Sequence, residues 1–191
     1  MKICYIDVET SGLDKEKCAL LQLSGAIIIG GKLQEEFDFF VKPFEDDAID
    51  PEALEICGFT EEQITSDPTF RNPKDVHNDF TKLLGKYVNK YKKEDKFYLA
   101  GYNSHSFDHQ FLRQFFLKCG DKYMGSWFFF PSIDIMLIAA YKLIGKRHLL
   151  ENFKLMTVAK FLGIEVDEEK AHSAIYDIRI TRQILLELYK M

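Results

Sequence analysis

The sequence predicts an α/β fold in which a mixed five-stranded sheet is flanked by helices. Three strand-like apolar segments come first, and two more then alternate with segments of helical periodicity. This order of strands and helices implies a mixed sheet that is covered by helices. At 191 residues the chain has the length of one ordinary domain, and we expect residues 1–191 to form a single one.

The first three strands follow one another directly. The first runs into Asp7 and Glu9, and residues 18–29 have the apolar character of a buried strand. Gly30-Gly31 then supplies the positive backbone angles of a two-residue hairpin, which leads into a third strand over residues 32–42. These strands therefore form a meander.

Capping signals mark the helices that come next. An N-cap followed by proline starts a short helix at residues 50–51, and a capping box at residues 60–63 starts a second one. A longer helix begins at residues 72–73 and keeps its apolar periodicity as far as Tyr91. A stripe of lysines on this helix is interpreted as a solvated face, with phosphate steering as the alternative: Lys82, Lys86, Lys90 and Lys93.

Strands and helices alternate in the second half of the chain. A strand over residues 97–101 leads into a helix whose aromatic stripe begins at Phe107, and a fifth strand ends near residues 131–134. Asp134 then caps a helix over residues 136–143, which is a sufficient role for it, so we leave it out of the site. The remaining elements are a basic loop at 145–148, a short helix at 157–162 and a last helix from Ser173.

Acidic residues stand where the strands end. Because side chains alternate faces along a strand, Asp7 and Glu9 share one side, about 6.5 to 7 Å apart at their Cα atoms. Such charges at the edge of a core need basic side chains or metal ions as partners, unless both simply begin an exposed loop. Asp108 follows the fourth strand, and His172 and Asp177 open the last helix. Acidic groups at strand ends face the ligand crevice in sheets of this class, so four carboxylates and one histidine converge in principle.

Composition narrows the functional classes. A formal net charge of −5 is the wrong sign for holding long duplex nucleic acid through a basic surface. Four cysteines without C-x-x-C spacing argue against zinc and for reduced thiols, and they predict a cytoplasmic location. No stretch approaches about 18 consecutive apolar residues, so we expect no membrane partner.

Three motifs, in this order, resemble those of the DEDDh exonucleases, the DnaQ-like group with an RNase H-like fold. The first is Asp7-Val8-Glu9-Thr10-Ser11-Gly12-Leu13, the second is Tyr102-Asn103-Ser104-His105-Ser106-Phe107-Asp108, and the third is His172-Ser173-Ala174-Ile175-Tyr176-Asp177. The resemblance also covers residues 56–60, where Cys57 and Phe59 depart from the His-Gly-Ile-Thr type of turn that the family tends to carry. Tyr102 is a further departure, since this position is often histidine. These departures put substrate preference in doubt more than chemistry.

The resemblance implies phosphodiester hydrolysis with two divalent ions, Mg²⁺ or Mn²⁺. It implies that Asp7 bridges both ions, that Glu9 and Asp177 complete the first site, and that Asp108 supports the second. His172 would take the proton from the attacking water; the alternative is an ordinary surface histidine near a helix N-terminus. Four carboxylates with no thiolate nearby favour Mg²⁺ or Mn²⁺ over Zn²⁺.

The substrate contacts are less firmly indicated. Single-stranded ends are held by stacking, which tolerates any base. Leu13, Phe59 and Phe107 are the candidate wedges, and each could equally be a core residue. With them, the full set of candidate substrate-binding residues is Thr10, Gly12, Leu13, Phe59, Asn103 and Phe107.

Three functions compete on the sequence alone. We favour a metal-dependent 3′→5′ exonuclease acting on single-stranded or frayed 3′ ends of DNA, RNA or both, which releases 5′-mononucleotides. The second is a proofreading or accessory subunit that acts mainly by binding a polymerase or clamp, although binding alone does not require all five groups. The third is a structural Ca²⁺ domain, against which the lack of an EF-hand pattern counts. A polymerase partner and a homodimer both stay open.

Overall fold

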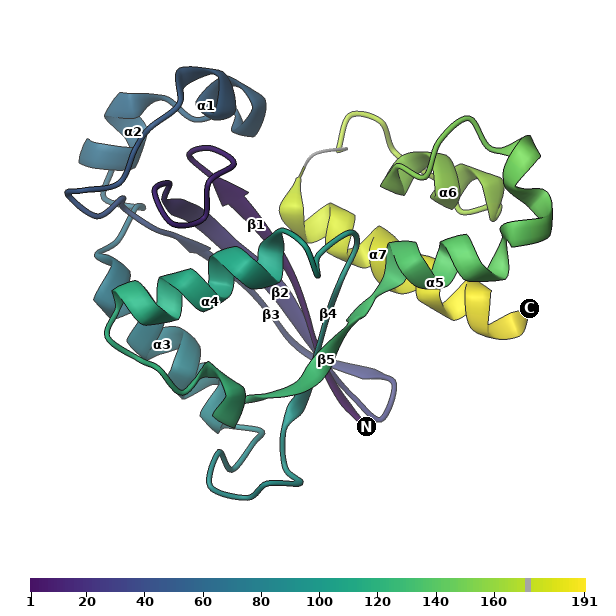
Figure 1. Ribbon diagram of the computed structural model, residues 1–191, viewed down its shortest axis with the longest axis horizontal. Helices are drawn as coiled ribbons and strands as arrows, with labels where there is room; N and C mark the ends of the chain where they lie inside the picture. The colour runs from purple at the N-terminus through teal and green to yellow at the C-terminus, as the bar shows by residue number, and fades with distance from the viewer. Residues whose placement is uncertain (171–172) are drawn as a thin grey trace.

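The computed structural model describes residues 1–170 and 173–191, and its centre is a five-stranded sheet of order β3-β2-β1-β4-β5 (Figure 1). β1 pairs antiparallel with β2 and parallel with β4, so the sheet is mixed, as predicted. The strands are β1 Lys2–Thr10, β2 Leu20–Ile29, β3 Lys32–Phe40, β4 Phe97–Gly101 and β5 Phe128–Asp134. The predicted fold class is therefore confirmed.

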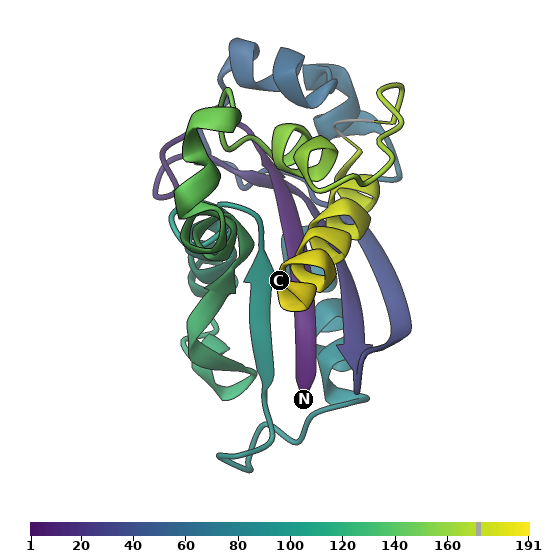
Figure 2. The same ribbon diagram turned by 90° about the vertical axis from the view of Figure 1, so that its right-hand side faces the viewer.

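Helices cover both faces of the sheet. α3 (Pro73–Gly85) and α4 (Asp108–Lys118) lie on one face, and α5 (Ile135–Lys142), α6 (Leu155–Phe161) and α7 (Ala174–Lys190) lie on the other (Figures 1 and 2). The short helices α1 (Pro51–Cys57) and α2 (Glu61–Ser66) lie near the end of β1. Two 3₁₀ helices, η1 (Met124–Ser126) and η2 (Ile144–Leu149), complete the described part of the chain. None of its helices is both long and apolar enough to cross a membrane.

The alternation of β1 divides the core into two layers. Cys4, Ile6 and Val8 pack into the layer under α3 and α4. Ile3 and Tyr5 pack into the layer under α5, α6 and α7. The same alternation directs Asp7 and Glu9 toward the α7 face, at the point where the strand leaves the core.

The helix predicted to extend to Tyr91 is shorter than its apolar pattern. α3 ends at Gly85, a poor helix former, and Lys86 is its C-cap. Beyond that point the Lys2 ammonium donates a hydrogen bond to the Tyr87 carbonyl, which ties the segment to β1 instead. The predicted lysine stripe is therefore not one helix face, since only Lys82 of its four members lies in α3.

One smaller prediction also needs correction. The basic segment 145–148 is not a loop but part of η2, because the Arg147 guanidinium donates to the Leu150 carbonyl at 2.7 Å and lies 5.3 Å from the Phe153 ring centroid. α4 begins at Asp108, as predicted, and Phe107 is its N-cap. The glycine hairpin, the first two helix starts and the bounds of β4 are as predicted.

Candidate active site

β1 places the first two carboxylates. Its pairing with β4 runs only from Ile3 to Tyr5, whereas its pairing with β2 continues to Thr10. The strand therefore overruns its parallel neighbour, and its last residues leave the middle of the sheet. Asp7 and Glu9 lie in this overrun, half-buried and on the α7 side.

Asp108 completes the edge that β4 leaves open. It is the first residue of α4, is buried, and its Oδ1 accepts a hydrogen bond from the Val8 amide at 3.0 Å. That amide faces the side on which β4 has already ended, so the carboxylate replaces a missing strand partner. A buried backbone donor needs such a partner, and the bond fixes Asp108 against β1.

Asp177 comes from the opposite face of the sheet. It lies in the first turn of α7, where the positive end of the helix dipole favours a negative charge. α7 packs against β1 through a set of buried side chains, and this packing brings Asp177 toward the β1 carboxylates: Ile178, Ile180, Ile184, Leu185 and Leu188. His172, the predicted general base, lies outside the described residues.

The charges of the other three carboxylates act on the pKa of Asp7. Burial raises the pKa of Asp7 well above its usual range, and the charges of Asp108, Glu9 and Asp177 raise it further. Burial likewise raises the pKa of Asp108 to about 7, although the Val8 amide opposes the shift. A bound cation would offset the repulsion between these carboxylates, so the cluster of negative charge in a half-buried place indicates a candidate cation site.

The donor set fits a hard divalent cation, because it consists of carboxylate oxygens. Within residues 1–170 and 173–191, however, no group of three or more His, Cys, Asp or Glu side chains is arranged so that it could already hold a metal ion.

A thiol stands closer to the site than the sequence indicated. Cys57 lies beside Glu9, and its Sγ donates a hydrogen bond to the Thr10 carbonyl at 3.5 Å. Burial first, and then the Glu9 charge, raise the pKa of this thiol to about 12. The group therefore stays a neutral thiol near pH 7. A sulfur atom does lie near the carboxylates, but it is not a thiolate, as expected.

The loop after β1 holds three candidate substrate residues. The Thr10 hydroxyl donates to the Gly12 carbonyl at 2.8 Å. A Cβ on Gly12 would stand 2.6 Å from the Cys18 sulfur, so a side chain does not fit there. Leu13 is 86% exposed, which leaves it free to contact a ligand.

The aromatic candidates are less available. Phe59 is half-buried and packs edge-on against Phe40 and Phe70, with ring centroids 6.1 and 5.3 Å away. Phe107 is half-buried too, and its ring centroid lies 4.9 Å from that of Phe111. Both rings are therefore part of the core, which was the alternative interpretation of each. Asn103 is exposed and takes the left-handed conformation, with φ 55°.

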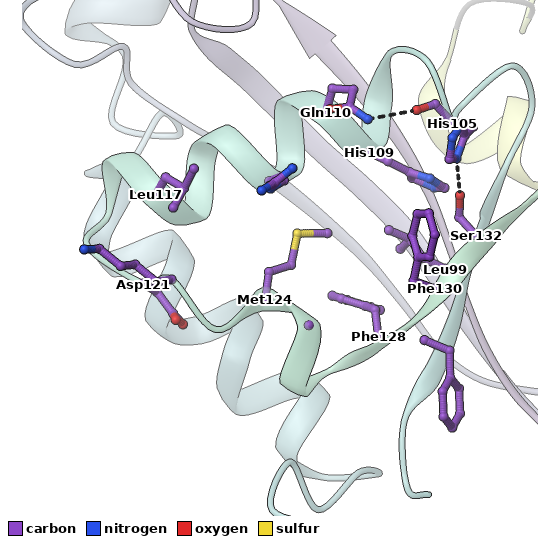
Figure 3. Close-up of a pocket in the computed structure, with 14 residues that line it drawn as sticks. Leu99, His105, His109, Gln110, Leu117, Asp121, Met124, Phe128, Phe130 and Ser132 are labelled. Atoms are coloured by element: carbon purple, nitrogen blue, oxygen red, sulfur yellow. Dashed lines mark hydrogen bonds between the residues drawn. The ribbon is translucent and has the colours of Figure 1, made fainter. Parts of the chain in front are cut away.

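A cavity of about 380 Å³ lies beside the site, between α4 and β5 (Figure 3). His105, His109 and Ser132 are among its lining residues, and none of the four carboxylates is. Both ring nitrogens of His109 are buried without a hydrogen-bond partner among the described residues. Burial and the neighbouring His105 lower the pKa of His109 to about 4, so it is neutral near pH 7. The cavity is thus distinct from the carboxylate cluster.

Asp134 is the residue that the sequence interpretation left out. It caps α5 as predicted, but it also accepts hydrogen bonds from the Asn103 and His105 amides, both at 3.1 Å. These amides belong to the turn that leads to Asp108. An acidic residue at the end of β5 was the available signal, and it resembles the signal that identified Asp7.

Comparison with known proteins gives a consistent family. The exonuclease family model RNase_T matches residues 4–185. A PolC-type DNA polymerase III from Oceanobacillus iheyensis is 28% identical over 182 residues, which are 95% of this chain and 11% of the polymerase. Ribonuclease T from Yersinia enterocolitica is 28% identical over 193 residues, covering 96% of this chain and 82% of that enzyme.

A solved structure confirms the RNase H-like fold. E. coli Exonuclease I in complex with a dT13 oligonucleotide is similar with a TM-score of 0.77 and 24% identity, over 100% of this chain and 41% of that one. The chain therefore spans about a tenth of the PolC-type polymerases and two-fifths of Exonuclease I. Because the family model covers nearly the whole sequence, the protein belongs to this exonuclease family, the DEDDh group that its three motifs resemble.

Proposed function

We propose that the chain is a 3′→5′ exonuclease that hydrolyses phosphodiester bonds at single-stranded or frayed 3′ ends of DNA, RNA or both, and releases 5′-mononucleotides. The observation that supports this proposal is the hydrogen bond from the Val8 amide to Asp108, which joins the first two motifs, together with the charges of Asp108, Glu9 and Asp177, which after burial raise the pKa of Asp7. The dT13 oligonucleotide bound to Exonuclease I supports a single strand as the substrate class.

Exonucleases of this family depend on divalent metal. The finer proposal is that two Mg²⁺ or Mn²⁺ ions are held by Asp7, Glu9, Asp108 and Asp177. Such a pair of ions supplies an activated water and relief of negative charge on the leaving oxygen. The carboxylate oxygens fit these hard cations, and the neutral thiol of Cys57 does not compete as a thiolate ligand.

The chain's own residues then have separate tasks. The Val8 amide donates a hydrogen bond to Asp108, which restrains the orientation of its carboxylate. His172 accepts the proton of the attacking water, a role that rests on its spacing to Asp177 in the third motif. Leu13, on the exposed loop after β1, contacts the terminal base, and Thr10, Gly12 and Asn103 line the path of the strand end.

Phe59 and Phe107 enter this proposal in a reduced role. Because each ring already packs against other aromatic rings, it can offer only one edge to a base. We therefore assign the main apolar contact with the terminal base to Leu13, which is 86% exposed.

Other parts of the proposal concern the chain's setting. The exonuclease domain is taken to span residues 1–191 in a cytoplasmic protein. The PolC-type relatives are the observation that favours the second candidate, a proofreading module attached to a polymerase. A homodimer is the alternative partner.

One degradation assay tests the function. Purified protein is incubated with 5′-labelled DNA and RNA oligonucleotides in Mg²⁺, Mn²⁺ or EDTA. We expect stepwise shortening from the 3′ end with either ion and none in EDTA. Asp7→Ala should keep less than about a tenth of the wild-type rate, because metal and charge effects are each worth several kcal/mol. Asp75→Ala, which removes an exposed carboxylate in α3, is the control and should cleave normally.

A further inference from the structure

Asp134 makes more contacts than a helix cap requires. It is 7% exposed and stands between the end of β5 and the start of α5. Its Oδ1 accepts hydrogen bonds from the Met136 amide at 3.0 Å and from the Asn103 amide at 3.1 Å. Its Oδ2 accepts from the His105 amide at 3.1 Å. One buried carboxylate therefore joins α5 to the turn between β4 and α4, 29 to 31 residues away in sequence.

The turn that Asp134 holds has a conformation that needs support. Asn103 is the one non-glycine residue with positive φ in the described part of the chain, a backbone conformation that most L-residues avoid and that asparagine tolerates. A second contact from β5 reaches the same turn, since His105 Nδ1 lies 2.9 Å from Ser132 Oγ (Figure 3). Two side chains at the end of β5 thus clamp residues 103–105.

The clamp has consequences for Asp108 because α4 lacks its own cap. Phe107, the N-cap residue, makes no side-chain hydrogen bond to the first turn of the helix. The start of α4 is instead tied to the preceding turn, where the His109 amide donates to the Ser104 carbonyl at 2.9 Å. The position of the turn therefore sets the position of Asp108 relative to the Val8 amide.

Capping alone does not explain the residue. A serine or threonine hydroxyl caps a helix about as well as a carboxylate, and it does so without burying a charge. The oxygens of a buried carboxylate need several hydrogen-bond donors, and the backbone amides that donate to Asp134 belong to two separate elements. The second element is the one that carries Asn103 and Asp108.

We infer that Asp134 is a positioning residue of the active site, which holds the 103–105 turn so that Asp108 and Asn103 face the β1 carboxylates. The inference rests on the proposed exonuclease function. Residues that orient metal ligands from outside typically affect metal affinity or activity by about 10- to 100-fold, and Asp134 falls in this class through the backbone of the turn.

Asp134→Ser separates the two roles, because serine retains a cap for α5 but cannot reach the turn with a second oxygen. The control is Asn72→Ala, which removes the cap of α3 far from the turn. We expect both variants to fold, with Asp134→Ser unfolding at the lower denaturant concentration because the Asn103 and His105 amides lose their acceptor. Compared with the wild type, Asp134→Ser should bind Mn²⁺ about 10-fold more weakly, as measured by calorimetric titration without substrate. It should also lose about 10- to 100-fold in kcat at saturating Mn²⁺, whereas Asn72→Ala should change neither quantity.

The opposite result is equally clear. If Asp134→Ser matches Asn72→Ala in both kcat and Mn²⁺ affinity, Asp134 is only a cap and the inference is wrong. Should Asp134→Ser fail to fold, Ser132→Ala removes just the contact to the His105 ring, and the inference then requires a several-fold loss in kcat and Mn²⁺ affinity with unchanged unfolding. Absence of nuclease activity in the wild-type protein would reject the proposed function, whereas the Mn²⁺ titrations would still test the positioning role.

Discussion

Replacing Asp108 with asparagine should stabilise the metal-free protein while removing its activity. The folded state raises the pKa of this carboxyl from 3.8 to about 7, chiefly by burial. Each tenfold change in proton affinity corresponds to 1.36 kcal/mol, so the ionised form costs the folded state about 4 kcal/mol. Asparagine carries no charge, and its Oδ1 can still accept the hydrogen bond that the Val8 amide donates to Asp108 at 3.0 Å.

The sign of the pH dependence follows from the raised pKa. The folded state binds this proton more tightly than the unfolded state, so the stability that the proton provides is complete below about pH 4 and is lost as the pH rises toward 7. Asp7 acts in the same direction, since its pKa is raised too. The free energy of unfolding of Asp108→Asn should therefore exceed that of the wild type by about 4 kcal/mol at pH 8 and by under about 2 kcal/mol at pH 5.

Urea unfolding in EDTA at the two pH values measures this difference directly. Addition of Mn²⁺ at pH 8 should stabilise the wild type more than Asp108→Asn, because an ion bound to the folded state alone adds to its stability. The raised pKa of Asp108 would be refuted if the gap between the unfolding free energies of variant and wild type were equal at pH 5 and pH 8. It would also be refuted if the variant were less stable than the wild type at pH 8. Asp75→Asn serves as the exposed control and should show no such gap.

Three further predictions concern the reaction and its substrate. His172→Ala should lose about 10²- to 10⁴-fold in kcat and the acid-side fall in rate, with oligonucleotide binding retained, as pH–rate profiles and anisotropy titrations will show. Leu13→Ala should raise KM about fivefold with little change in unfolding, since the side chain is 86% exposed, whereas Phe59→Ala should lower the unfolding midpoint because its ring packs against Phe70. A circular single strand should stay intact under conditions that degrade its linear form, as gel electrophoresis will report.

Local patterns predicted the elements whose causes are local. The glycine hairpin, the caps of α1 and α2 and the bounds of β4 all depend on residues a few positions apart, and all match the structure. α3 ends at Gly85, and just beyond it the Lys2 ammonium takes the Tyr87 carbonyl as its acceptor from 85 residues away, in competition with a longer helix. Apolar periodicity could not reveal that competition, and the predicted helix was therefore too long.

The candidate site divides in the same way. Alternation along β1 was enough to place Asp7 and Glu9 on one side, because that rule involves one strand. The bond from Val8 to Asp108 depends on where β4 ends beside β1, which is a matter of register between distant segments. Asp134 was assigned only its local task as a cap, since its second task exists only once β5 and the β4–α4 turn are neighbours.

The charge of the molecule constrains the order in which its ligands bind. A chain of net charge −5 with several carboxylates at the proposed site repels a phosphate backbone there. A divalent cation reverses the local sign, so its binding and that of the strand end should assist each other, and thermodynamic linkage requires this assistance to be mutual. Burial first, and then the neighbouring carboxylates, raise the pKa of Asp7, and contacts outside the cluster hold these residues in place. The Val8 amide and the packing of α7 on β1 are such contacts.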